Sequence, residues 1–314
     1  MKYTMSANVR RKSKFTILKN DLKRNRTLYI MIIPVILFYL YFCYRPMYGA
    51  LIAFKEYNPV KGIIGSEWIG FENFREFFTS VYFFRVLKNT LVISLSSLIF
   101  CFPAPIIFAL LINELQSKIF KSAVQTVTYM PHFISLVVIC SMVNEFTALG
   151  GIINNLISFF GGEEIQFMNE PKWFVPIYII SDLWQSLGWN SIIYLAALSG
   201  VDEALYDAAK IDGAGRIRQT ISVTLPALIP TIVTLLILRI GTLLSVGYEK
   251  IILLYTPMTY ETADVISSYV YRAGLINTRY GYAGAVGLFN SVINFILVLS
   301  ANTISRKVNG TSLW

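Results

Sequence analysis

Six long apolar windows constrain the fold of this chain more than any other feature. A helix needs roughly 20 residues to cross the hydrocarbon core of a bilayer, and the windows are about that long or longer. The composition agrees, because 55% of the 314 residues are hydrophobic and only 14% are charged, unlike a soluble domain. The sequence therefore predicts an all-α, polytopic membrane protein with six transmembrane helices, centred on 28–44, 86–112, 124–143, 174–198, 225–246 and 282–304.

Basic residues mark one end of the chain. Residues 1–27 hold nine Lys and Arg against the single acid Asp21, so nearly all of the formal net charge of +9 lies there. Such a tail also suits nucleic acids, but beside an apolar span it is typical of retention in the cytoplasm. With six spans, we expect a basic cytoplasmic tail at 1–27, a transmembrane domain at 28–305 and a cytoplasmic C-terminal tail at 306–314, with no nucleic acid as partner.

Residues that carry enzymatic chemistry are scarce. The three cysteines lie in or beside apolar windows and predict neither a disulfide nor a metal site. His132 is the only histidine, which disfavours a Ser-His-Asp triad or a histidine metal site, and we expect it to be structural. The chain has no GxxxxGK[ST] phosphate loop. We therefore expect no catalytic residue, no metal and no cofactor bound by this chain.

A short polar loop between the fourth and fifth windows carries the most specific motif. It reads YDAAKIDG at 206–213 and reaches a Leu-Pro pair at 225–226. Small alanines permit the close approach of a partner surface, and glycine lets the backbone turn sharply. The loop predicts a docking element, with an ordinary interfacial helix as the alternative. The residues assigned to docking are Asp207, Ala208, Ala209, Gly213, Leu225 and Pro226.

This loop resembles the cytoplasmic "EAA" loop of binding-protein-dependent ABC importer permeases. Asp207 stands where that motif usually has Glu, and Val223 where it usually has Ile. In that family the helix of the loop fits a cleft on a separate ATPase and transmits its closure to the membrane spans. The resemblance extends over nearly the whole chain, and external segments at 46–59, 68–74, 248–250 and 263–272 are similar to the oligosaccharide and polysaccharide branch, relatives of maltose and alginate-oligosaccharide permeases.

The resemblance implies a type I ABC importer permease fold in a bacterial plasma membrane, with both termini cytoplasmic. It implies import of oligosaccharides or polysaccharide fragments by alternating access, driven by ATP that partner subunits use. The implied partners are a second, homologous permease, two ATP-binding subunits and an extracytoplasmic sugar-binding protein. The coupling loop is expected at about 200–224, and an extracytoplasmic segment at about 247–281.

A sugar path needs polar groups for hydroxyls beside aromatic rings for C–H faces, and the fourth window offers both. The alternative is that its Trp residues anchor at the interface and its polar groups bond to other helices. Arg239 in the fifth window is costly in hydrocarbon and should face protein, water or an acid, with Asp182 as the obvious partner. The expected path residues are Asp182, Trp184, Gln185, Trp189, Asn190, Tyr194 and Arg239.

Two further patterns concern packing. Val265, Ile266, Tyr269 and Val270 recur at helical spacing, so we expect an amphipathic external helix over the mouth of the cavity. Glycines at 281, 284 and 287 in the sixth window favour the close approach of a neighbouring helix.

Other functions stay open at this point. A permease for a non-sugar solute would keep the loop motif. An ion-coupled secondary transporter would more often show buried acids as an ion relay, which this sequence hardly offers. A membrane-embedded enzyme would need clustered acids, and the nearest pair, Glu163 and Glu164, follows two glycines as in a solvated turn.

Overall fold

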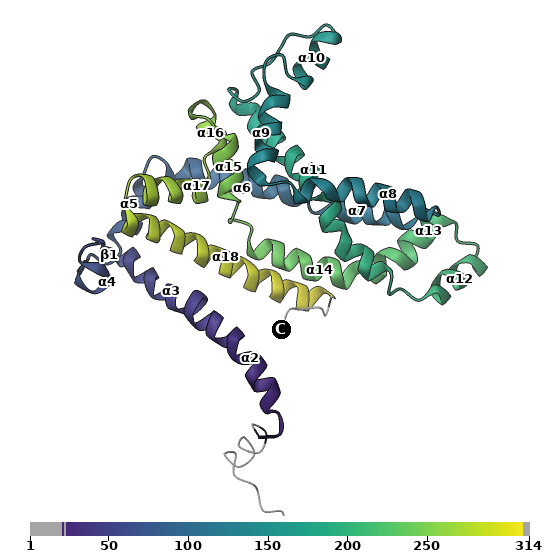
Figure 1. Cartoon of the computed structure of the whole chain (residues 1–314), viewed down its shortest axis with the longest axis horizontal. Coiled ribbons are helices and arrows are strands. Elements are labelled where there is room, and N and C mark those ends of the chain that lie inside the picture. Colours follow the sequence, from purple (N-terminus) through teal and green to yellow (C-terminus); the bar gives the residue numbers. More distant parts are fainter. Residues whose placement is uncertain (1–20, 22, 310–314) are drawn as a thin grey trace, which may run out of the picture.

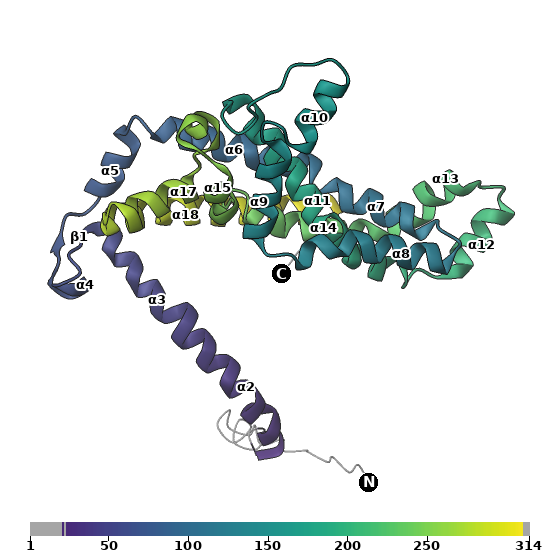
Figure 2. The same ribbon diagram turned by 45° about the horizontal axis from the view of Figure 1, so that its top comes forward.

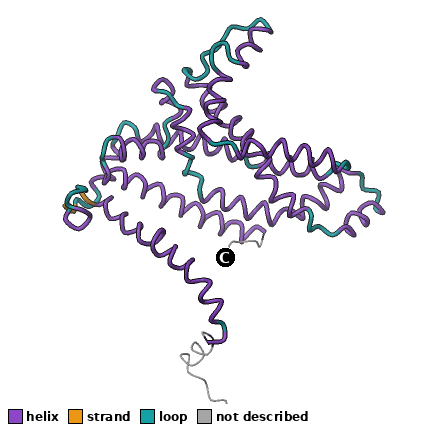
Figure 3. Tube along the Cα trace, viewed as in Figure 1, coloured by secondary structure: helices purple, strands orange, loops and turns teal. Residues whose placement is uncertain are grey.

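The computed structural model describes residues 21 and 23–309. Most of the basic tail expected at 1–27, and residues 310–314 of the C-terminal tail, therefore lie outside the described residues. Apart from one two-residue strand pair, β1 (Lys55–Glu56) and β2 (Glu67–Trp68), the regular structure of the described part is helical (Figure 3).

In the described residues of the first half of the chain there are nine α-helices. They are α2 (Arg26–Phe38), α3 (Arg45–Met47), α4 (Gly62–Gly65), α5 (Glu72–Thr79), α6 (Phe83–Phe100), α7 (Pro103–Asn113), α8 (Lys118–Tyr129), α9 (Leu136–Thr147) and α10 (Ile152–Phe159). Short π or 3-10 segments join them at η1 (Tyr39–Tyr44), η2 (Tyr48–Phe54) and η3 (Met130–Phe133).

The second half is equally helical. Its α-helices are α11 (Pro171–Leu198), α12 (Glu203–Ile211), α13 (Arg216–Gln219), α14 (Leu225–Gly241), α15 (Tyr248–Leu254), α16 (Tyr260–Ala263), α17 (Ile266–Tyr271) and α18 (Tyr280–Asn309). The π or 3-10 segments are η4 (Thr220–Thr224), η5 (Pro257–Thr259) and η6 (Arg272–Ile276).

Long helices lie side by side in one elongated bundle (Figure 1). α11 packs along α7, and α14 packs along α18. The short elements α4, β1 and α5 lie at one end of this bundle, and α12 and α13 lie at the opposite end (Figures 1 and 2). The chain therefore places its two groups of connecting segments at opposite ends, as expected of a membrane-spanning bundle.

Five described helical stretches are long and apolar enough to cross a membrane, namely Arg26–Phe54, Phe83–Asn113, Leu136–Phe159, Arg216–Gly241 and Tyr280–Lys307. The fourth expected span corresponds to α11, which is not among these five. Its 28 residues give a length of roughly 42 Å at about 1.5 Å per residue, enough for a bilayer. Polar residues, including Asp182 and Gln185, make it less apolar than the others.

The third expected span, 124–143, is not one continuous helix. α8 ends at Tyr129, a 3-10 turn containing Pro131 follows, and α9 begins at Leu136 with Ser135 as its N-cap. A proline has no amide hydrogen and restricts the residue before it. The chain therefore changes direction here, and α9 and α10 rise out of the bundle while α8 lies along it (Figure 1).

The N-terminal helical arm, Arg26–Phe54, leaves the bundle (Figures 1 and 2). None of the residues of α2, η1 or α3 is buried. Contact with the bundle begins only at η2, which packs against α18. Gly281 of α18 permits this contact, because a Cβ there would lie 3.1 Å from the Ile52 carbonyl oxygen of η2 and 2.6 Å from the Lys55 carbonyl oxygen that follows it. The expected close approach of a neighbouring helix is confirmed at Gly281 and Gly284, but it is wrong for Gly287, where no atom lies within 4 Å of a Cβ.

The segment from Tyr248 to Ile276 folds back onto the bundle. Asp264 is fully buried, and its Oδ2 accepts hydrogen bonds from Arg85 of α6 at 3.4 Å and Arg272 at 2.6 Å. Asn89 of α6 donates to the Asp264 carbonyl at 3.0 Å. Val265 is also fully buried. This segment is thus fixed to α6 by a buried ion-pair cluster.

Candidate functional site

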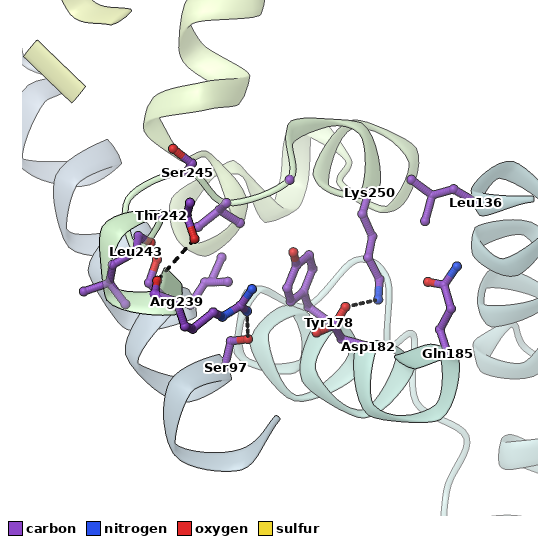
Figure 4. A pocket seen from close by; sticks show the side chains of 14 residues that line it. Ser97, Leu136, Tyr178, Asp182, Gln185, Arg239, Thr242, Leu243, Ser245 and Lys250 are labelled. Carbon is purple, nitrogen blue, oxygen red and sulfur yellow. Dashed lines mark hydrogen bonds and ion pairs between the residues drawn. The ribbon is translucent and has the colours of Figure 1, made fainter. Parts of the chain in front are cut away.

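A polar cavity of about 260 Å³ lies where α6, α11, α14 and α15 meet (Figure 4). One face of α11 supplies three of its lining residues, since Tyr178, Asp182 and Gln185 recur at spacings of four and three residues. α14 contributes Arg239, and α15 contributes Lys250. Side chains that are distant in sequence therefore converge on one site.

The Lys250 ammonium forms an ion pair with the Asp182 carboxylate at 3.5 Å. The Lys250 side chain is only 5% exposed, whereas that of Asp182 is 28% exposed. Burial lowers the pKa of the Lys250 ammonium, and the Asp182 carboxylate opposes that shift. The ammonium also lies 5.0 Å from the centre of the Tyr178 ring. Asp182 is thus the counter-charge that makes burial of Lys250 tolerable.

Arg239 has a different environment. Its Nη2 donates a hydrogen bond to the Ser97 hydroxyl of α6 at 2.7 Å. Among the described residues no carboxylate forms an ion pair with it. The expectation that Asp182 pairs with Arg239 is therefore wrong, because Lys250 reaches Asp182 from α15. In Figure 4 Tyr178 lies between the Arg239–Ser97 pair and the Lys250–Asp182 pair.

A second cavity of about 490 Å³ adjoins the first and shares Asp182 and Arg239 with it. Asn190 and Tyr194 line this second cavity, together with residues of α7 and α14. Asp182 and Asn190 are eight residues apart on α11, which places them on one face. The structure therefore brings together five of the seven path residues expected from the sequence.

Trp184 and Trp189 line neither cavity. Trp189 stacks on His132 with ring centres 4.4 Å apart and planes at 5°, which gives His132 the structural contact expected of it. Next to Trp189, Gly188 lies against the Thr128 backbone of α8, where a Cβ would collide with the carbonyl oxygen. This face of α11 is therefore packed against α8 and the turn that follows it.

Lys250, Tyr178 and Ser97 line the cavity but are not predicted from the sequence. The neighbours of Lys250 in the sequence are too polar for lipid, which predicts an external segment. Ser97 and Tyr178 carry no distinctive signal by themselves. The one usable signal was the spacing of Tyr178 to Asp182 and Gln185, which places all three on one helical face.

The expected coupling loop contains α12 and α13 and projects from one end of the bundle (Figures 1 and 2). Asp202 caps α12 by accepting a hydrogen bond from the Ala204 amide at 2.9 Å. No residue of α12 is buried, and the Asp207 side chain is 70% exposed, with Lys210 3.0 Å away. Gly213 ends the helix with φ of 75°, a conformation that favours glycine.

Two contacts hold this loop in place. The Tyr206 hydroxyl lies 3.0 Å from the Thr224 hydroxyl, and the Gln219 amide donates to the Ala214 carbonyl at 2.6 Å. Leu225 and Pro226 begin α14, so that the loop leads directly into a long helix of the bundle. The loop thus presents an exposed surface on a defined backbone.

Comparison with known proteins places the chain in a family. The model of the family described as binding-protein-dependent transport system inner membrane component matches residues 79–310. The Bacillus subtilis (strain 168) protein LplB is 44% identical over 93% of this chain and 92% of its own length. The polygalacturonan/rhamnogalacturonan transport system permease protein YteP of the same organism is 47% identical over 90% of this chain and 89% of its own length.

Solved structures agree with the sequence relatives. A chain in the crystal structure of a bacterial ABC transporter involved in the import of the acidic polysaccharide alginate has a TM-score of 0.87 and 46% identity, over 93% of this chain and 99% of that one. A second structure, of a bacterial alginate ABC transporter in complex with alginate pentasaccharide-bound periplasmic protein, has the same TM-score and identity.

A helical bundle with a polar cavity between its helices and an exposed loop at one end suits a membrane transport subunit. The chain belongs to the family of inner-membrane components of binding-protein-dependent transport systems. The resemblance identified from the loop motif is thereby confirmed, as is the type I ABC importer permease fold. It is a multi-pass membrane protein of a bacterial transport system that depends on a binding protein.

Proposed function

We propose that this chain is the permease subunit through which an ATP-driven importer moves oligosaccharides or polysaccharide fragments across the bacterial plasma membrane. The likeness over at least 90% of the chain to a transporter involved in alginate import and to a polygalacturonan/rhamnogalacturonan permease carries this proposal. No comparable likeness supports the two alternatives, a permease for a non-sugar solute and an ion-coupled secondary transporter.

The joined cavities are the proposed sugar path. Asp182, Gln185 and Asn190 offer hydrogen-bonding groups for hydroxyls, and Tyr178 offers an aromatic ring. Sites for small molecules commonly combine such convergent polar groups with apolar walls. Alternating access then exposes this path to one side of the membrane at a time, because the helices that line it move relative to one another.

The loop from Asp202 to Pro226 is the proposed coupling element to a separate ATPase. α12 has no buried residue, and Leu205 and Ile211 are 52% and 88% exposed at its surface. Exposed apolar side chains on a capped helix suit a protein partner. We propose that two such ATPase subunits bind and hydrolyse ATP, and that this chain contributes no catalytic group.

This assignment fixes the orientation. The end of the bundle that carries α12 and α13 faces the cytoplasm, and the end with α4, β1 and α5 faces the extracytoplasmic side, where a sugar-binding protein docks. The chain termini are then cytoplasmic, in keeping with the basic residues of 1–27.

A second permease is the proposed partner of the N-terminal arm. The apolar window of Arg26–Phe54 is 0% buried within this chain. Lipid alone could cover such an apolar helix. Because the arm points away from its own bundle, a second subunit could also pack against it. A homologous permease in this position would form a heterodimer around the path.

Purification from the native membrane in mild detergent, followed by mass spectrometry, tests the assembly. We expect an ATPase and a second permease to accompany the unmodified chain and the matched control Glu163→Arg, which alters an exposed loop acid. The variant Asp207→Arg should lose the ATPase but keep the second permease. Absence of an ATPase from all three samples, together with uptake that follows an ion gradient after ATP is removed, would overturn the proposal.

A further inference from the structure

The fixed charges of the 260 Å³ cavity do not balance. Two cations, Arg239 and Lys250, and one carboxylate, Asp182, line it. Because Asp182 pairs with Lys250 at 3.5 Å, one positive charge is left over. Arg239 belongs to the candidate membrane span Arg216–Gly241, and an ionisable residue within a span is costly and marks a functional site by default.

Arg239 carries the unbalanced charge. It donates a hydrogen bond to a neutral hydroxyl, that of Ser97, at 2.7 Å, and in the described part of the chain no ion pair involves it. A guanidinium has five N–H donors in a planar fork, and Ser97 accepts from one nitrogen. The residue is more than a third exposed and borders both cavities, so its remaining donors are accessible from the proposed path.

From this charge arrangement we infer that the cavity binds a carboxylate of an acidic oligosaccharide, with Arg239 as its ion-pair partner. The planar guanidinium matches a carboxylate in a bidentate manner. Asp182 already balances the Lys250 charge, so Arg239 supplies the free cation of the cavity. Tyr178 lies between the two pairs (Figure 4) and lines the same cavity.

This inference rests on the proposed function and narrows its substrate to sugars that carry a carboxylate. Neutral sugars would leave Arg239 without a counter-charge throughout the transport cycle. The alternative is that Arg239 only ties α14 to α6 through Ser97, in which case the charge of the sugar would not matter for binding.

Binding to the purified, detergent-solubilised transporter, without its sugar-binding protein, tests the inference. The probes are tetragalacturonate, an alginate tetrasaccharide and the carboxyl-reduced, neutral form of each, with intrinsic tryptophan fluorescence as readout. We expect at least one acidic probe to bind about tenfold or more tightly than its neutral form, as a charge-assisted hydrogen bond implies. The preference should weaken as salt rises.

Variants separate recognition from structure. Arg239→Gln should abolish the preference by weakening the acidic probe about tenfold more than its neutral form, and Arg239→Lys should retain part of the preference. Lys172→Gln, which alters an exposed lysine paired with Glu170 outside the cavities, should behave like the unmodified chain. Size-exclusion profiles show whether each variant is folded and assembled.

Each outcome bears on a different claim. If the neutral probes bind as tightly as the acidic ones, or if Arg239→Gln weakens both equally, the carboxylate site is overturned while the oligosaccharide path stands. If none of the four probes binds, although the purified complex contains its ATPase, the carboxylate site is overturned and the sugar path of the proposed function is overturned with it.

Discussion

Lys250 and Asp182, 68 residues apart in the chain, face each other at 3.5 Å and join α15 to α11. Lys250 is almost fully buried, so the pair fixes the returning segment of the chain against the helix that lines both cavities. Ser267 of the same segment donates a hydrogen bond to the Val246 carbonyl at 2.7 Å. The position of α15 therefore depends on a polar contact as well as on apolar packing.

Removal of either partner of this pair should destabilise the bundle. We expect Lys250→Met or Asp182→Asn to cost about 1–3 kcal/mol, because each leaves a largely buried polar group without its partner. The double variant should recover part of that loss, as coupled residues do in a double-mutant cycle. Thermal unfolding in detergent measures all three. Strictly additive losses would show that the two side chains do not interact.

Gly188 should not tolerate a larger side chain. A Cβ at this position would collide with the Thr128 carbonyl oxygen of α8. Gly188→Ala should therefore separate α8 from α11, at a cost of about 1–3 kcal/mol. Gly287→Ala is the matched control, since no atom lies within 4 Å of a Cβ built there. Fluorescence-detected size-exclusion chromatography after heating compares them. Equal heat resistance of the two variants would contradict the observed helix contact.

Gly213 should be required for the shape of the coupling loop. Its φ of 75° costs a residue with a Cβ about 1 kcal/mol, so Gly213→Ala should reduce the amount of ATPase that co-purifies. Gly215→Ala is the control, because that glycine has φ of −71° and open space around it. Both variants should keep the same melting temperature within a few degrees. Loss of the ATPase from both, or from neither, would show that the left-handed turn is not what the partner needs.

Asp264 should be more important for stability than an exposed acid. Asp264→Asn leaves Arg85 and Arg272 without their shared buried carboxylate, and we expect a loss of about 3–5 kcal/mol. The control Glu76→Gln removes an acid from a half-exposed pair with Arg279, which should cost about 0–1 kcal/mol.

Hydrogen exchange gives the readout for this comparison. Amides of residues 260–276 should lose protection in Asp264→Asn and keep it in Glu76→Gln, since local opening follows the loss of local contacts. If the Asp264 variant keeps the protection of this segment, the buried cluster is not what holds the segment to α6.

The sequence by itself determined the class of protein, the positions of most spans and the place of the polar loop that carries the family motif. Apolar length predicts a membrane helix because lipid leaves no other way to satisfy the backbone. The loop motif depends on residues that are contiguous in the chain, so it is readable without a structure. Asp182, Gln185 and Arg239 were likewise recognisable because charged and amide side chains are rare within apolar windows.

Only the tertiary structure decided which charges meet. Lys250 reads as part of a polar external segment, yet the fold returns it to the cavity, where it takes the carboxylate expected to pair with Arg239. The break after Tyr129 and the stacking of Trp189 on His132 also depend on contacts between separate helices. Hydropathy is a sum over neighbouring residues in the sequence. Ion pairing and close packing depend instead on distances between residues far apart in the chain, and the arrangement of the helices sets those distances.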